Sequence, residues 1–280
     1  MTETQIPLPG ILRAHEAWLA NSRDGHQADL GGMTLNDQDL HGAVLSRAIL
    51  TGARLLHANL AGADLTGADL TGATCAGACL QDANLSEVAI REANFKMARL
   101  DGVRMLDASV QQASFRQVSA RSASFHHSGF YDVDWSGSDL GLAQFYHARL
   151  QHCSMAGIIA EGASFHGSKL DHCNYSRARL DEAQFLRAEI IQCVFSDASL
   201  RGADFRDARI RGCDFTRAVL AGARFGGAQL ATADFRGANL LGVRELTPAQ
   251  LLQSRSDETT ILPNGSRGPY LQYSGAEKPR

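Results

Sequence analysis

One five-residue pattern repeats without insertion or deletion from Ala28 to Leu240, and this strict period constrains the fold more than any other feature. The third residue of each repeat falls on a position number divisible by five, which gives 43 repeats whose central residues are all apolar. The residue two before the centre is alanine in 29 repeats, and the residue two after it is glycine in 18. A short period kept over this length is typical of a solenoid.

A period of five fits neither an α-helix nor a heptad coil, but it fits a short extended segment followed by a turn. In an extended segment, the centre and the residue two before it point to the same side, so each repeat places two side chains inside a tube. The two residues after the centre turn the chain, which accounts for the Gly, Ser, Thr and Asp found there. A large centre beside an inward alanine fills the interior without overpacking.

A second period predicts four repeats per coil. From Phe95 to Phe235 the centres tend to alternate between aromatic and aliphatic residues, so residues twenty positions apart should stack on one wall of a four-sided coil. The 43 repeats then form about eleven coils at the spacing of neighbouring strands. All 12 phenylalanines lie at centres. One predicted core ladder consists of Phe125, Phe145, Phe165, Phe185, Phe205 and Phe225.

These repeats resemble those of the pentapeptide repeat family, whose pattern is A-(D/N)-L-x-x. The pattern is carried by Ala63-Asp64-Leu65, Ala83-Asn84-Leu85 and Ala203-Asp204-Phe205, among others. The resemblance implies an all-β solenoid in the form of a right-handed quadrilateral β-helix. The segment from Arg104 to Ile159 departs most from the pattern, with Ser128 and Ser138 at inward positions, so the coil is expected to be irregular there.

The chain divides into an N-terminal segment (1–26), the repeat β-helix (27–244) and a C-terminal cap and tail (245–280). Residues up to Leu8 should be loose. The pattern from Pro9 to about Ser22 predicts an amphipathic helix that covers the exposed first coil. His15 lies on its apolar face and is expected to be a packed ring rather than a ligand.

The C-terminal part begins with a helix signal. Thr247 followed by Pro248 is typical of an N-cap and first helical position, which predicts a short helix to about Arg255. The remainder is expected to be an extended, partly disordered tail. Its apolar residues suggest that some of it lies back along a wall or contacts a partner.

Composition and motifs argue against several functional classes. The chain is 44% hydrophobic and 20% charged, with a formal net charge of −3. It has no run of eighteen apolar residues and no basic leader, so neither a membrane span nor a signal peptide is expected. It has no nucleophile elbow, phosphate loop or HExxH motif, and a packed tube offers no concave pocket. We therefore expect a cytoplasmic protein that is not an enzyme and uses no cofactor.

Four of the six cysteines are spaced by twenty residues and occupy inward positions. A linear stack lacks tetrahedral zinc geometry, and parallel inward thiols are poorly oriented for disulfide formation. The thiols are expected to be small, reduced core residues, which favours a cytoplasmic setting. The predicted ladder consists of Cys153, Cys173, Cys193 and Cys213.

Six of the ten histidines lie between residues 126 and 172. Folding the sequence every twenty residues gathers them into outward columns, on a surface that also carries Tyr131, Arg149, Lys169 and Arg206. Three interpretations are open: ordinary corner residues, a recognition patch for a protein partner, or a metal site, because stacked imidazoles bind metal ions readily. The patch is here named the His/Tyr face and consists of His126, His127, Tyr146, His147, His152, His166, His172 and Arg187.

The resemblance also implies a competing function. Quinolone-resistance members of the family resemble duplex DNA in width and charge, occupy the DNA site of gyrase and dimerise through their C-terminal coils. Such mimicry requires a dominant negative field, whereas residues 28–244 contain 23 acidic and 21 basic residues. The C-terminal third is crowded with arginines, namely Arg201, Arg206, Arg209, Arg211, Arg217 and Arg224.

We therefore expect a rigid interaction surface for an unidentified protein partner, with no direct nucleic-acid or membrane binding. The alternative is a DNA-mimicking protein, possible as a homodimer, that binds DNA gyrase or another type II topoisomerase and protects or inhibits it.

Overall fold

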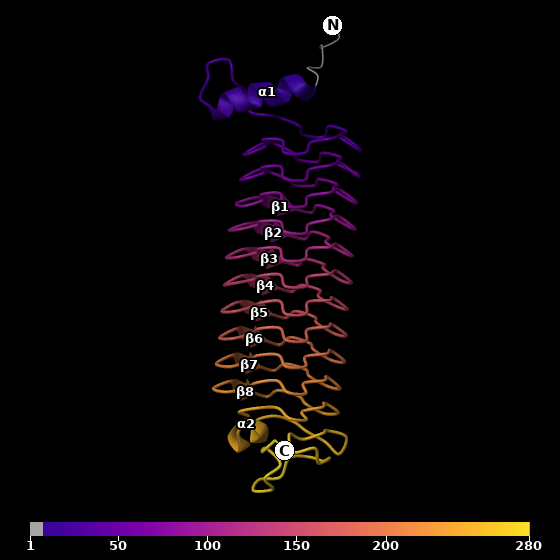
Figure 1. The fold of residues 1–280 in the computed structure, drawn as a ribbon, viewed down its shortest axis with the longest axis vertical. Helices are drawn as coiled ribbons and strands as arrows, with labels where there is room; N and C mark the ends of the chain where they lie inside the picture. Colours follow the sequence, from indigo (N-terminus) through magenta and orange to yellow (C-terminus); the bar gives the residue numbers. More distant parts are fainter. Residues whose placement is uncertain (1–7, 280) are drawn as a thin grey trace.

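The computed structural model describes residues 8–279 and shows a solenoid of stacked coils with a helix near each end (Figure 1). Helix α1 (Leu8–Leu19) precedes the coils and helix α2 (Pro248–Leu252) follows them. Eight strands form one parallel sheet in chain order, and each pairs with the strand twenty residues further on. The strands are β1 (Ala89–Arg91), β2 (Ser109–Gln111), β3 (Gly129–Tyr131), β4 (Arg149–Gln151), β5 (Lys169–Asp171), β6 (Glu189–Ile191), β7 (Arg209–Arg211) and β8 (Gln229–Ala231).

The expected all-β solenoid is confirmed, but its continuous sheet is shorter than the repeat region. The eight strands delimit about seven turns, fewer than the eleven coils expected from the repeats. Elsewhere the same offset of twenty residues is kept by isolated parallel bridges, from Asp29↔Ile49 to Arg224↔Arg244. The numbers differ because three successive residues pair only on the wall formed by β1–β8, whereas the other walls and the N-terminal coils pair through single residues.

The segment Arg104–Ile159 keeps this register, and the expected irregularity is limited to two corners, before Ala108 and before Val118. Its inward serines are accommodated by hydrogen bonds to the neighbouring coil. The Ser128 hydroxyl donates to the Met105 carbonyl at 2.7 Å and accepts the Ala108 N–H at 3.0 Å. Ser138 makes the equivalent bonds at 2.7 and 3.2 Å. Each buried hydroxyl thus takes the place of the direct hydrogen bond that closes the turn at the equivalent corners, so the change is local and every polar group stays satisfied.

The interior is solid. Every repeat centre is buried, and the phenylalanine ladder from Phe125 to Phe225 stacks with ring centroids 4.7 to 5.0 Å apart. A second aromatic column lies on the opposite wall and meets the first edge-on in the interior, as in Phe165 against Tyr175 at 6.0 Å and 89°. Stacked contacts within a column and T-shaped contacts between columns are both favourable geometries for aromatic rings.

The cysteine ladder is part of this core. Cys153, Cys173, Cys193 and Cys213 are buried, and each thiol lies 3.4 to 3.5 Å from a carbonyl oxygen of the neighbouring coil. Burial raises the pKa of the Cys193 thiol well above its usual range. Because all four thiols are buried against backbone carbonyls, the ladder serves as core packing.

Every fifth residue turns the chain through the left-handed backbone region. The 43 corner residues, from position 32 to position 242 in steps of five, have φ between 50° and 74°. Only 18 of them are glycine. The turn is supported by the Asp or Asn that precedes each family-type centre, since its side chain accepts the N–H two residues on, as Asp64 Oδ1 does from Thr66 at 3.0 Å.

Helix α1 lies across the N-terminal end of the tube (Figure 1). It begins one residue earlier than expected, and the other residues expected to be loose, 1–7, lie outside those described. Leu8, Ile11 and Leu12 pack against the core. His15 is fully buried, and its Nδ1 accepts the Ala28 N–H at 3.0 Å. His15 is therefore a packed ring that caps the first coil.

At the other end, α2 begins with Thr247 in a capping box with Gln250. The residues that follow lie back on the tube, as their apolar side chains suggested, instead of extending away from it. Arg255 and Ile261 pair in parallel with the last repeats, and Leu262 and Tyr270 are buried. The chain thus adds a partial coil that covers the last coil with its own residues.

Candidate interaction face

The first part of the His/Tyr face is one continuous group of rings. Tyr146 contacts His126 at a centroid distance of 4.7 Å and His166 at 6.1 Å. The neighbouring corner brings His127 and His147 into a stack at 5.4 Å, and His147 also meets His166 edge-on at 5.9 Å. The three rings of the central column are half-buried and the two corner rings are exposed. Five aromatic side chains therefore form one surface across three coils.

The second part lies across a narrow wall. His152 and His172 contact each other at 5.1 Å, and Tyr131 meets His152 edge-on at 5.8 Å. This pair and the first group flank the wall formed by β3, β4 and β5, whose outward side chains include Arg149 and Lys169. The His/Tyr face is thus two ring clusters on either side of one strip of sheet.

Arg187 belongs to the corner column of His127 and His147 but lies apart from their rings. Gly167 occupies the position between them, and the His147 ring covers it, because a Cβ built on Gly167 would lie 2.7 Å from that ring. Arg187 instead lines a surface hollow with Lys169 and Glu189. The structure therefore separates this arginine from the aromatic cluster with which the sequence grouped it.

Two leucines that the sequence analysis missed extend the face. The column of His126, Tyr146 and His166 continues to Leu106 on one side and Leu186 on the other, and both are half-buried. The column therefore carries apolar or aromatic side chains over five successive coils. Folding the whole sequence every twenty residues, rather than only its histidines, would have found them.

Hydrogen bonds fix two of the rings. His126 Nε2 lies 3.0 Å from Gln144 Oε1, and His172 Nδ1 lies 2.7 Å from Asp171 Oδ1. An oriented ring loses less conformational entropy on binding than a free one. The face is thus partly pre-organised for contact.

The negative charges of the repeats are engaged by hydrogen bonds and ion pairs within the coil. Each of the nine aspartates that precede a centre accepts the backbone N–H two residues on, at 2.8 to 3.2 Å. Hydrogen bonds from Arg206 help to hold the pKa of Asp204 below its usual value against the opposing effect of burial. Four of the nine also pair with arginines, namely Asp134, Asp139, Asp204 and Asp234.

Within residues 8–279, no three side chains of His, Cys, Asp or Glu converge as a metal-binding group. In that same part of the chain, no helix is long and apolar enough to span a bilayer.

Comparison with solved structures gives low-similarity matches to repeat proteins. HetL from Nostoc, a pentapeptide repeat protein involved in heterocyst differentiation regulation, is 22% identical over 94% of this chain and 100% of its own, with a TM-score of 0.41. A trypsin-treated form of QnrB1, a plasmid-mediated fluoroquinolone resistance protein, is 18% identical over 63% and 82%, with a TM-score of 0.31. A pentapeptide repeat protein from the Arabidopsis thaliana thylakoid lumen is 29% identical over 39% and 72%, with a TM-score of 0.30. No protein with a curated description matches the chain.

The family models are more direct. The model described as pentapeptide repeats matches overlapping segments at residues 28–67, 48–86 and 68–105. The model described as a pentapeptide repeat region matches residues 168–244. With its five-residue period and its parallel coils, the chain belongs to the pentapeptide repeat family.

Proposed function

We propose that this protein acts without catalysis, as a rigid surface to which a protein partner binds through the His/Tyr face. The observation that carries the proposal is the half-buried column from Leu106 to Leu186, which places aromatic and apolar side chains on five successive coils. Aromatic residues in such clusters are enriched at the centres of protein interfaces. Ordinary corner positions elsewhere in the repeats carry mostly small or charged residues.

Rigidity supports the same function. Neighbouring coils are joined by backbone hydrogen bonds of 2.6 to 3.4 Å throughout the repeats, and the interior is filled. A partner that binds this wall would therefore order little of the backbone, which lowers the entropic cost of association.

A site-specific photo-crosslinker tests the proposal. A benzoylphenylalanine introduced at Tyr146 should crosslink a discrete protein in cells, whereas the same group at Ser176, a half-buried position on the opposite wall, should not. The double variant Tyr146→Ala/His166→Ala should lose affinity for that partner. Unchanged binding by the double variant would exclude this face.

DNA mimicry remains the competing hypothesis, and two features argue against it. The repeat aspartates are engaged by backbone N–H groups and arginines, which weakens the outward negative field that a gyrase groove would recognise. The last coil is covered by residues 253–270, so a dimer joined through C-terminal coils would first have to displace them.

Gyrase supercoiling and drug-induced DNA cleavage, measured with the purified protein titrated in, separate the two functions. The proposed function predicts no effect. Inhibition or protection at micromolar protein would favour the DNA mimic instead.

A further inference from the structure

The wall of β6, β7 and β8 carries a pair of arginines that have no acidic partner among residues 8–279. Arg209 and Arg211 are both exposed and stand on the same strand two residues apart. Neither guanidinium has a carboxylate within 4 Å in the described part of the chain. By contrast, Arg206, Arg217 and Arg236 on the same coils form ion pairs at 2.6 to 2.7 Å.

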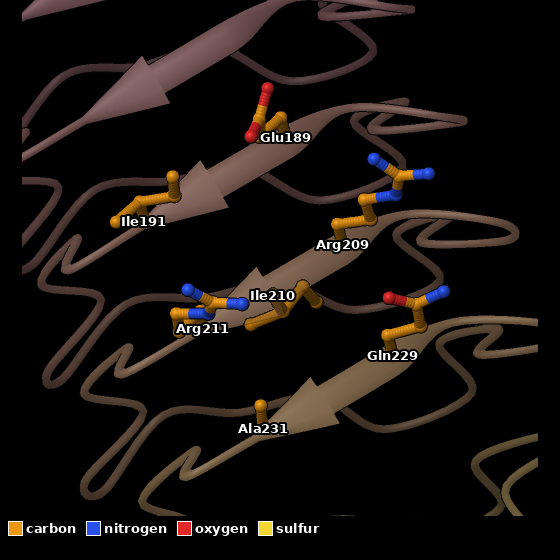
Figure 2. Close-up of a pocket in the computed structure, with 7 residues that line it drawn as sticks. All are labelled: Glu189, Ile191, Arg209, Ile210, Arg211, Gln229 and Ala231. Carbon is orange, nitrogen blue, oxygen red and sulfur yellow. The ribbon is translucent and has the colours of Figure 1, made fainter.

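The neighbours of Arg209 explain why it is free. In the sheet register it lies between Glu189 and Gln229. The Glu189 carboxylate is directed towards the preceding strand, where it pairs with Lys169 at 3.6 Å, and Figure 2 shows it pointing away from Arg209. The only acidic residue in register with Arg209 is thus engaged elsewhere.

The neighbours of Arg211 are apolar. It lies in register between Ile191 and Ala231, and the short Ala231 side chain leaves space beside it (Figure 2). These residues line a shallow hollow of about 200 Å³ together with Arg209, Glu189 and Gln229. The hollow therefore combines two free guanidinium groups with a small apolar rim.

We propose that this hollow binds an extended acidic segment of a protein, in which carboxylates alternate with uncharged residues. Residues i and i+2 of an extended chain project to the same side about 6.6 Å apart, which is also the separation of two outward residues on one strand. Two alternating carboxylates can therefore each meet one guanidinium, in the charge-assisted geometry that arginine favours.

The surroundings favour such a peptide over nucleic acid. Glu189, Asp171 and Asp207 border the same wall, so a continuous phosphate backbone laid along it would meet like charge. A short segment in the hollow meets only Glu189 of these three, whose carboxylate is paired with Lys169 and directed away from Arg209. The proposal rests on the proposed function in one respect, that the ligand is a protein, but it uses a different surface.

Fluorescence anisotropy with the full chain tests this directly. The probe is a fluorescein-labelled nine-residue peptide in which Glu alternates with Val, and the control peptide has Gln in place of each Glu. We expect the acidic peptide to bind and the control not to bind. The affinity should fall as salt is raised, because both arginines are exposed.

Variants then locate the site. Arg209→Gln and Arg211→Gln should each weaken binding about threefold to tenfold, and the double variant by more than tenfold. Arg201→Gln removes the same charge from the opposite wall and should leave the affinity within about twofold.

Three results would each overturn the proposal: no binding to the wild-type chain at millimolar peptide, an equal loss in Arg201→Gln, or tighter binding of a DNA oligonucleotide at the same hollow. None of them depends on the crosslinking result at Tyr146, so failure here is distinguishable from failure of the proposed function.

Discussion

The coils before residue 88 and those after it make the same turn with different residues. In the first group, eleven of the twelve centres are leucine and seven of the twelve corners are glycine. In the second group, the centres include all 12 phenylalanines, one tryptophan and one tyrosine, and only eleven of 31 corners are glycine. Both groups keep the same offset of twenty residues.

This difference shows that the turn does not depend on glycine corners or leucine centres. It depends on backbone pairing between coils and, where an Asp or Asn precedes the centre, on the side chain that caps the turn. The second group can therefore carry large side chains at its corners. The His/Tyr face and the arginine pair both lie in this group. Four predictions test the comparison, in order of decreasing effect.

The largest effect is expected in the core. Phe165→Ala should cost about 3–5 kcal/mol of unfolding free energy, because it removes a ring stacked on both sides and leaves a cavity. Leu65→Ala, in the same column of the leucine group, should cost less, about 2–4 kcal/mol. Urea unfolding followed by circular dichroism measures both. Full stability in Phe165→Ala would refute the inward placement of centres, and equal costs would remove the energetic distinction between the groups.

The second effect is a gain in stability. The Tyr175 hydroxyl is buried with no hydrogen-bond partner among the described residues, and desolvation raises the pKa of this phenol well above 10. Tyr175→Phe keeps the stack on Phe195 and removes the unsatisfied group, so it should stabilise the protein by about 1–3 kcal/mol. Thermal unfolding provides the measurement. Tyr146→Phe, on the surface, is the control and should change little.

The third effect concerns the corners. Leu142 is exposed and has φ of 60°, a strained conformation for its side chain. Leu142→Gly should relieve the strain and stabilise the protein by about 0.5–1 kcal/mol after the entropy of the unfolded chain is counted. Gly72→Ala should have the opposite sign, because its φ is 67° and the nearest atoms to a new Cβ lie 3.8 Å away, so no clash contributes. If both substitutions changed stability in the same direction, corner strain would not govern stability.

The smallest effect is a pH dependence of stability that differs between the two ends of the tube. Burial lowers the pKa of His15, so the contribution of its neutral ring is present above its ordinary value of 6.5 and is lost as the pH falls below it. Hydrogen bonds, first among them the one from Thr259, lower the pKa of Asp257 from 3.8 to about 2. The contribution of Asp257 to stability therefore persists to lower pH and is lost between those two values.

The melting temperature as a function of pH should therefore fall in two windows. His15→Gln should remove the first and Asp257→Asn the second. A wild-type melting temperature that is constant from pH 7 to 5 would contradict the role given to His15.

Much of the fold could be predicted from the sequence because each repeat carries its own structural information. An apolar centre, an inward alanine and a polar turn recur every five residues, and the twenty-residue columns follow by counting. The helices around His15 and Thr247 were also found, since capping signals and amphipathic spacing are local.

The errors arose where contacts between coils decide the outcome. Ser128 was expected to make the coil irregular, and the turn that it alters is the one before Ala108, in the neighbouring coil. The helix was expected to reach about Arg255 and the residues after it to form an extended tail, because no repeat pattern marks them, yet the open edge of the last coil supplies pairing partners for Arg255 and Ile261.

The sequence by itself determined the tube, because a strict period leaves the chain one way to bury its apolar centres. Tertiary structure decided the chemistry of the surface. The ring contacts of Tyr146 and the covering of Gly167 by His147 depend on side chains twenty residues apart. The freedom of Arg209 depends likewise on the direction in which Glu189 points. The period fixes which residues share a wall, but the rotamers and pairings on that wall are set by neighbours that only the stacked coils bring together.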